Sequence, residues 1–271
     1  MKANILSVGL TAPGLVNFES FKALMLSGQE PNVSEPLEKY SPAFLPANER
    51  RRTTATIKLA LKTAEEALTN YKEQFPEADL QIPVLFVCKD GDTLISARMC
   101  QAVSEVEPMI SPTQFHNSVH NAPAGYWMIG QENQAPASAI SVGQYAIANG
   151  LLEAVLQSQS EMKPVLVVTY DLPLDDLMPV NTTQKGQLPF AFSLILDASG
   201  VNQSGHQKSK RPELSLSLTQ AGADQQLDNP YQGLPAAEGY PLLQAIALFQ
   251  EKSEEMTFPL NEHNFVKLAL S

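Results

Sequence analysis

Two uninterrupted apolar runs constrain the fold of this chain most. Residues 82–88 read Ile-Pro-Val-Leu-Phe-Val-Cys, and residues 164–170 read Pro-Val-Leu-Val-Val-Thr-Tyr. Each run is far shorter than the about 20 apolar residues that a membrane-spanning helix needs. A short run without polar alternation is typical of a strand that is covered on both faces. We therefore expect a central sheet with helices on either side.

Helical patterns separate these runs. Between residues 48 and 71, Ile57, Leu61, Ala64 and Leu68 recur at helical spacing, and Asn48 is placed to cap the helix. The same reading predicts further helices at 93–103, 144–157 and 242–252, short helical pieces at 112–130, and strands within 5–16 and at 137–142, 189–197, 214–218 and 265–270. Strands and helices alternate along the chain, so the predicted class is α/β with a mainly parallel sheet covered by helices.

Two polar stretches interrupt this pattern. Residues 171–187 are expected to form a surface loop, and residues 199–211 a mobile hairpin tip. Three acidic residues at the start of the first stretch, Asp171, Asp175 and Asp176, could suggest a divalent cation. Because they stand in a proline-containing segment after a strand, a solvated turn is the better interpretation.

Charge and cysteine usage limit the possible partners. The formal net charge of −11 argues against nucleic acid, whose binding relies on clustered Lys and Arg, and against adhesion to anionic lipid. The two cysteines, Cys88 and Cys100, are interpreted as buried free thiols rather than a disulfide. We expect a cytoplasmic protein with no membrane insertion and no cofactor.

Histidines and arginines offer weaker signals. His116 and His120 are four residues apart, but no third ligand accompanies them, so packed or interfacial histidines are favoured over a metal site. The cluster Arg50 to Arg52 could contact an acidic protein partner. A solvated face of an amphipathic helix is an equally good explanation of that cluster.

The central part of the chain carries an extended motif. Residues 111–125 read Ser-Pro-Thr-Gln-Phe-His-Asn-Ser-Val-His-Asn-Ala-Pro-Ala-Gly, with Asn121 and Gly125 in an Asn-x-x-Ala-Gly pattern, followed by Pro136. This stretch resembles the active-site region of the β-ketoacyl synthases of the thiolase superfamily. Laid on this pattern without a gap, the position of the family's nucleophilic cysteine falls on Gln144. Residues 45–52 and 188–196 resemble the early helix and the closing strand of the same half.

The resemblance covers roughly residues 1–220 and implies a thiolase-like, N-terminal ketosynthase half with a truncated second half. Residues 221–271 are then expected to be a C-terminal helix and strand extension packed on the same domain. The second half of these synthases normally supplies two catalytic histidines in characteristic motifs. After residue 190 only His206 and His263 remain, and neither lies in such a motif.

A glutamine at position 144 cannot take part in the condensation reaction that the family performs. Condensation holds the acyl chain as a thioester on a thiolate at a helix N-terminus and generates a carbanion beside imidazole donors. A carboxamide cannot accept an acyl group, although it can donate and accept hydrogen bonds. No catalytic residue is therefore assigned, and no activity is expected of the chain alone.

A glutamine at this position is also what chain length factors of type II polyketide systems show, and the chain resembles their truncated members from aryl polyene synthesis. The resemblance implies a heterodimer with a full-length catalytic ketosynthase, with the acyl carrier protein bound mainly through that partner. The strand at 137–142 would pair antiparallel with its counterpart in the partner. The helix at 93–103 would then approach the partner's acyl tunnel, which makes Ile95, Met99 and Phe115 the candidates for limiting chain length.

The alternative is an enzyme. Some ketosynthase-like domains with glutamine at this position decarboxylate malonyl groups to provide a starter unit. Those domains keep the histidines that hold the developing enolate, and the motifs for them are not found in this sequence.

Overall fold

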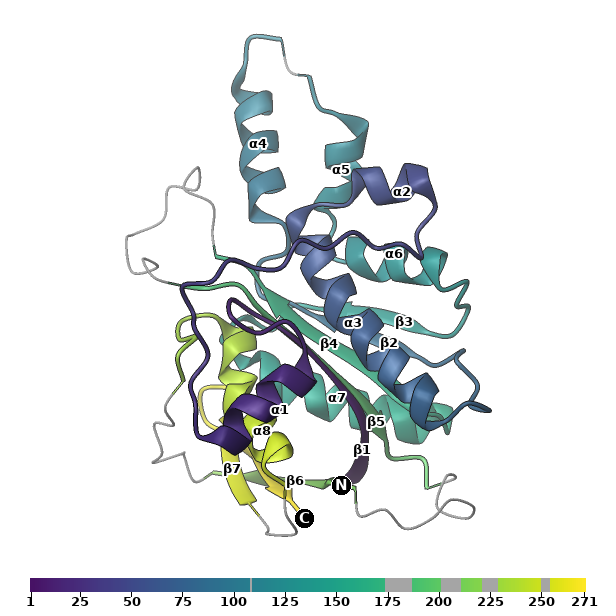
Figure 1. Ribbon diagram of the computed structural model, residues 1–271. Coiled ribbons are helices and arrows are strands. Elements are labelled where there is room, and N and C mark those ends of the chain that lie inside the picture. The colour runs from purple at the N-terminus through teal and green to yellow at the C-terminus, as the bar shows by residue number, and fades with distance from the viewer. Residues whose placement is uncertain (108, 174–186, 201–210, 221–228, 250–253) are drawn as a thin grey trace.

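The computed structural model describes residues 1–107, 109–173, 187–200, 211–220, 229–249 and 254–271, and its centre is one twisted sheet (Figure 1). Among these residues the sheet has eight strands in the order β3-β2-β4-β5-β1-β6-β8-β7. The strands are β1 (Lys2–Thr11), β2 (Val84–Val87), β3 (Ala137–Ile140), β4 (Val165–Asp171), β5 (Phe190–Asp197), β6 (Glu213–Thr219), β7 (Glu254–Pro259) and β8 (Phe265–Leu270).

The sheet is mixed, so the prediction of a mainly parallel sheet is wrong. Strand β2 pairs parallel with β3 and β4, whereas the five other pairings of the described strands are antiparallel. Parallel neighbours need a crossover, and helices provide it only on the β2 side of the sheet. Apolar runs reveal strands but carry no information on strand direction.

The helices are α1 (Phe18–Ser27), α2 (Ala47–Arg52), α3 (Ala55–Gln74), α4 (Thr93–Ser104), α5 (Pro112–Ser118), α6 (Ala122–Gly130), α7 (Ala146–Glu161) and α8 (Tyr240–Ala247), with 3₁₀ turns η1 (Gly143–Tyr145) and η3 (Pro235–Gly239). Helix α1 and strand β7 were not predicted. Helix α8 begins before the predicted residue 242, and residues 250–252 of that prediction lie outside the described residues. So do most of the predicted loop at 171–187 and of the predicted hairpin tip at 199–211.

The predicted helix at 48–71 is two helices. Thr53 and Thr54 are extended between α2 and α3, and the Thr54 hydroxyl accepts a hydrogen bond from the Ile57 amide at 3.2 Å. Threonine competes with the helix through its hydroxyl, which explains a break that starts a new helix. Asn48 lies inside α2 and does not cap it, because the helix begins after Pro46.

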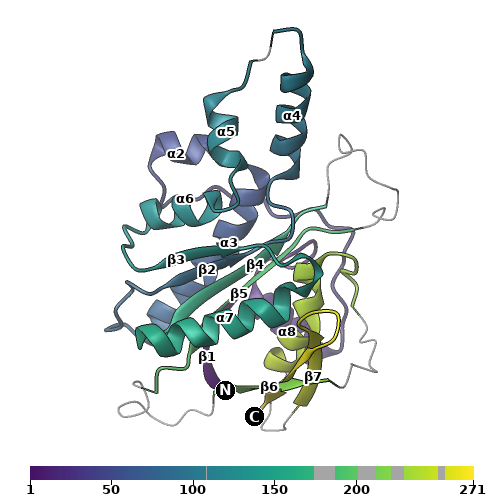
Figure 2. The ribbon, with the colours of Figure 1, turned by 180° about the vertical axis from the view of Figure 1, so that it is seen from behind.

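Two helical layers cover the sheet. Helices α3 and α6 pack on one face, and α7 and α8 on the other (Figures 1 and 2). Strand β2 sends Val84 and Phe86 to the α3 side and Leu85 and Val87 to the α7 side, so its uninterrupted apolar run does fill two cores. At Gly150 of α7 an added Cβ would stand 3.1 Å from a Val87 methyl, so glycine keeps α7 close to β2.

The described segments of the predicted C-terminal extension continue this sheet. Strand β8 pairs with β6 and β7, and Tyr231 and Leu234 are buried in the same core as α7. The division of the chain near residue 220 stays a prediction. Within the described ranges, no helix combines the length and apolarity needed to cross a bilayer.

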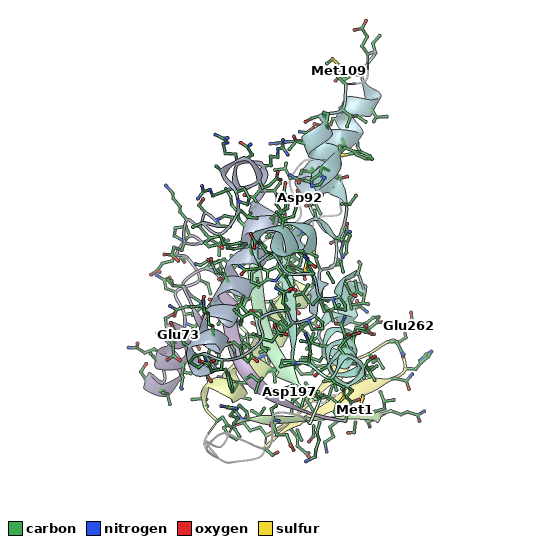
Figure 3. All side chains as sticks on the ribbon, turned by 90° about the vertical axis from the view of Figure 1, so that its right-hand side faces the viewer. Met1, Glu73, Asp92, Met109, Asp197 and Glu262 are labelled. Carbon is green, nitrogen blue, oxygen red and sulfur yellow. The ribbon has the colours of Figure 1, made fainter. Side chains whose placement is uncertain are left out.

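Helices α4 and α5 form an arm that stands out from this body. Figure 3 shows Asp92 at the base of the arm and Met109 at its far end. Asp92 caps α4 by accepting a hydrogen bond from the Ile95 amide at 3.0 Å. The outer part of the arm exposes apolar side chains, of which Val106 and Met109 are 99% and 83% exposed. An exposed apolar projection of this kind is typical of an interaction surface.

Candidate functional site

Gln144 lies in the 3₁₀ turn η1, between the edge strand β3 and helix α7. Gly143 enters the turn with a φ of 57°, which favours glycine. The Gln144 side chain is exposed and donates a hydrogen bond from Nε2 to the Tyr145 hydroxyl at 3.0 Å. An amide held in this way presents a polar group at the surface but offers no nucleophile.

Strand β3 beside Gln144 has an open side. It is last in the strand order and pairs with β2 alone among the described strands. The Pro136 and Ile140 carbonyls accept hydrogen bonds from the β2 side at 3.0 and 3.3 Å. Since backbone groups alternate in direction along a strand, those of Ala137 and Ala139 point to the open side. The edge can therefore accept another strand.

Exposed apolar side chains lie near this open edge. Ile129 lies on α6, which contacts β3, and its side chain is 52% exposed. Val119, in the connection from α5 to α6, is also exposed. An unpaired strand flanked by apolar groups has the chemistry of a protein interface.

The base of the arm is tied to the end of β3. The Ser141 hydroxyl donates to the Lys89 carbonyl at 2.6 Å, and the His120 Nε2 lies 3.0 Å from the Ile140 carbonyl. Lys89 precedes α4, and His120 follows α5. The two ends of the arm are therefore hydrogen-bonded to Ile140, the last residue of β3, and to Ser141, which follows it. Both residues are close in sequence to Gln144.

Asp171 holds the same base from the other side. Its carboxylate, 3% exposed at the end of β4, accepts hydrogen bonds from the Lys89 amide and from the Ala236 amide of η3, both at 2.8 Å. Burial raises the pKa of Asp171 to about 6, although these two bonds and one to Cys88 act against the rise. The predicted solvated turn is wrong for Asp171; Asp175 and Asp176 lie outside the described residues.

Cys88 belongs to this buried group. It is a buried free thiol, as predicted, and its sulfur accepts a hydrogen bond from the Gly91 amide at 3.2 Å. Burial, and next the charge of Asp171, raise the pKa of its thiol well above the ordinary range. Such a thiol is a poor nucleophile. Cys100 is exposed on α4, so its predicted burial is wrong.

The tunnel candidates lie in different surroundings. Ile95 is buried and lines a cavity of about 350 Å³ between the arm and the start of α3, together with Arg52, Arg98, Asn117 and Leu172. Met99 is half-buried on α4 outside that lining, and Phe115 on α5 is 61% exposed. The structure thus places all three on the arm, but only Ile95 against a cavity. Val103, farther along α4, is 57% exposed.

The motif residues are mostly structural in position. Asn121 precedes α6 and makes no capping bond with its side chain, Gly125 is exposed on α6, and the Pro136 carbonyl accepts from Val84. The ring of His116 packs edge-on against Tyr126, with 5.9 Å between the centroids. No three His, Cys, Asp or Glu side chains gather into a metal site in the part of the chain described.

Sequence reasoning missed Asp171 and Ser141 as structural links. The available signal was an acidic residue at the very end of an apolar run, since a carboxylate there can only be buried if backbone donors meet it. Those donors belong to residues 82 and 65 positions away, which no local pattern identifies.

A sequence model described as the N-terminal domain of β-ketoacyl synthases matches residues 27–265. No curated protein sequence matches the chain. One similar solved structure is described as a ketosynthase (ApeO) in complex with its chain length factor (ApeC) from Xenorhabdus doucetiae. Its TM-score is 0.69 at 20% identity, and the match covers 99% of this chain and 99% of the matched chain.

Two further structures extend the comparison. The complex described as AntDE:AntF, a type II PKS acyl-carrier protein with its ketosynthase, has a TM-score of 0.75 at 12% identity and covers 100% of this chain and 99% of its own. Ketosynthase twelve of the bacillaene synthase from Bacillus amyloliquefaciens has a TM-score of 0.55 at 14% identity, with 83% of this chain matching 46% of that one. These likenesses confirm the predicted thiolase-like fold of an N-terminal ketosynthase half.

Proposed function

Because this chain belongs to the β-ketoacyl synthase family, we propose that it is a chain length factor: a non-catalytic subunit that pairs with a complete β-ketoacyl synthase and helps to bound its acyl tunnel, in polyene synthesis of the aryl polyene kind. The observation that carries the proposal is Gln144. The turn between β3 and α7 is preserved, but its side chain cannot carry an acyl group.

The open edge of β3 supports the partner. In the proposal, Ala137 and Ala139 pair antiparallel with the equivalent strand of the ketosynthase, and the exposed Ile129 and Val119 are covered beside it. The new strand pair would place Gln144 near the shared boundary. Acyl carrier protein would be bound mainly by the ketosynthase.

The extent of the matches to solved structures gives independent support to the proposal. The bacillaene ketosynthase is matched over less than half of its length, whereas the matched chains of the ApeO/ApeC and AntDE:AntF structures are covered almost completely. The matched chains in those complexes are thus about as long as this one, and shorter than the bacillaene ketosynthase.

The position of the arm supports the proposed role in bounding the partner's acyl tunnel. It projects from the body beside β3, with Ile95 at a cavity near its base and Phe115 exposed on α5. In the proposed complex α4 lies toward the end of the partner's acyl tunnel, with Ile95, Met99 and Phe115 as the side chains that limit the product.

Co-expression with the catalytic ketosynthase, followed by product analysis, tests the proposal. The two chains should co-purify, and Met99→Ala should lengthen the product if this side chain forms the tunnel floor. Met25→Ala, which truncates a half-buried methionine on α1 far from the arm, is the matched control and should leave product length unchanged. An intact Met99→Ala complex with unaltered products would remove Met99 from the role, and a homodimer indifferent to the ketosynthase would argue for a scaffold instead.

The same purified chain tests the enzymatic alternative. Given malonyl carrier protein without a ketosynthase, it should release no carbon dioxide. Release that disappears in Gln144→Ala would establish a decarboxylase and overturn the proposal.

A further inference from the structure

At the α4 end of the arm, the backbone of a single residue, Lys89, is held by hydrogen bonds from both sides. The Lys89 carbonyl accepts from the Ser141 hydroxyl at 2.6 Å, and the Lys89 amide donates to Asp171 at 2.8 Å. Lys89 stands between the last residues of β2 and the cap of α4, so its position determines where α4 starts. The residues that hold it come from the ends of two other strands, β3 and β4.

Asp171 also reaches the C-terminal part of the chain. Its second carboxylate oxygen accepts from the Ala236 amide of η3, and η3 in turn contacts the turn η1 that carries Gln144. One buried carboxylate thus joins the start of the arm to η3, which lies beside the turn that carries Gln144. Hydrogen bonds to a charged acceptor in a buried site are stronger than neutral ones. The two bonds to Asp171 therefore hold Lys89 and Ala236 firmly in place relative to each other.

We propose that Asp171 is the positioning residue of the arm: it fixes α4 relative to Gln144 and thereby sets the tunnel geometry that the arm offers to the ketosynthase. This inference rests on the proposed chain length function. Asp171 itself is buried at the end of β4. It acts through Lys89, and the exposed Ser141 contributes the second, weaker tie.

The chain contains a matched control for this carboxylate. Glu66 on α3 also accepts two backbone hydrogen bonds, from Leu10 at 2.9 Å and Phe18 at 2.7 Å, and burial raises its pKa to about 7. Its bonds join β1 to the start of α1, away from the arm. Glu66→Gln therefore removes a comparable interaction without touching the base of α4.

Hydrogen exchange of the isolated chain, followed by mass spectrometry, tests the positioning directly. In Asp171→Asn the amides of residues 89–104 should exchange about tenfold faster, as expected when a hydrogen bond to a charged acceptor is lost. Glu66→Gln should instead accelerate exchange around β1 and α1. Ser141→Ala changes an exposed side chain and should leave the fold intact. It should increase the exchange rate of residues 89–104 about threefold, which is half of the Asp171→Asn effect in free energy.

Product analysis with the co-expressed ketosynthase completes the test. Asp171→Asn should broaden the range of product lengths while the complex remains intact, and Glu66→Gln should not. The inference is overturned if Asp171→Asn and Glu66→Gln loosen residues 89–104 equally, or if a loosened arm leaves the products unchanged. Failure of the proposed function is recognised separately, because then the unsubstituted chain does not associate with the ketosynthase at all.

Discussion

At one edge of the sheet, β3 offers Ala137, Ser138, Ala139 and Ile140, whereas at the other edge β7 carries Glu254, Glu255 and Pro259. Charged residues and proline on an edge strand prevent it from pairing with another chain. Strand β7 has both devices, and β3 has neither. The contrast shows that β7 carries features that hinder pairing with another chain and that β3 does not.

The largest expected effect comes from closing the open edge. Ala139→Pro removes an amide that points away from β2, so the sheet itself keeps its hydrogen bonds while intermolecular pairing loses one and meets a bulky ring. We expect binding to the ketosynthase to weaken about 100-fold or more, measured by calorimetry or by co-purification. The variant should keep the circular dichroism spectrum and thermal stability of the unsubstituted chain. Full affinity in a folded variant would contradict pairing through β3.

The buried carboxylate on the β3 side of the sheet should make the stability of the chain depend on pH. Asp171, on the β3 side, is buried near Cys88, Asp90 and Glu238, and its pKa is raised from 3.8 to about 6. A raised carboxyl pKa means that the folded chain holds the proton more tightly. Its contribution to stability is therefore complete below about pH 3.8 and is lost as the pH rises toward 6.

Asp171→Asn should remove that pH dependence. The difference in the free energy of unfolding between the unsubstituted chain and the variant should shift by up to about 3 kcal/mol across this interval, measured by urea unfolding at a series of pH values. The Glu255→Gln variant, in which the changed carboxylate is exposed on β7, is the control for the loss of a carboxylate as such. Parallel pH curves for Asp171→Asn and the unsubstituted chain would show that Asp171 is not the responsible group.

A smaller effect is expected from the apolar groups beside β3. Ile129→Ser truncates a side chain that is 52% exposed on α6, and it should weaken ketosynthase binding about tenfold, or ~1.4 kcal/mol. Leu26→Ser on α1 changes a side chain that is 57% exposed but lies away from β3, so it should leave binding unchanged. Equal losses in both variants would mean that the apolar residues near β3 have no special part in binding.

The sequence predicted the two sides of this comparison unequally. The apolar runs at β2 and β4 and the segment from β3 to α7 could be recognised because local pattern and family spacing agree there. Strand β7 was missed, since Glu-Glu-Met-Thr-Phe-Pro has no clear apolar alternation and becomes a strand only by pairing with β8. The role of Glu254 and Glu255 in preventing β7 from pairing with another chain therefore could not be predicted either.

The site shows the same limit. Gln144 was identified by its spacing within a motif, whereas the importance of Asp171 depends on the amides of Lys89 and Ala236, which the fold alone brings together. The direction of strands was likewise beyond the sequence pattern, because β5 is as completely buried as β4 although the two strands pair antiparallel.

The smallest expected effect is at the β7 edge of the sheet. Glu255 forms an ion pair with Lys267 at 2.7 Å, and both side chains are largely exposed. Exposed pairs contribute little because water and salt screen them, so Glu255→Ala should lower the free energy of unfolding by about 0.5 kcal/mol or less. Ketosynthase binding, measured as for Ala139→Pro, should not change, because β7 lies at the opposite edge of the sheet from β3. A loss of binding in this variant would mean that the partner reaches both edges, and the assignment of β3 as the open one would fail.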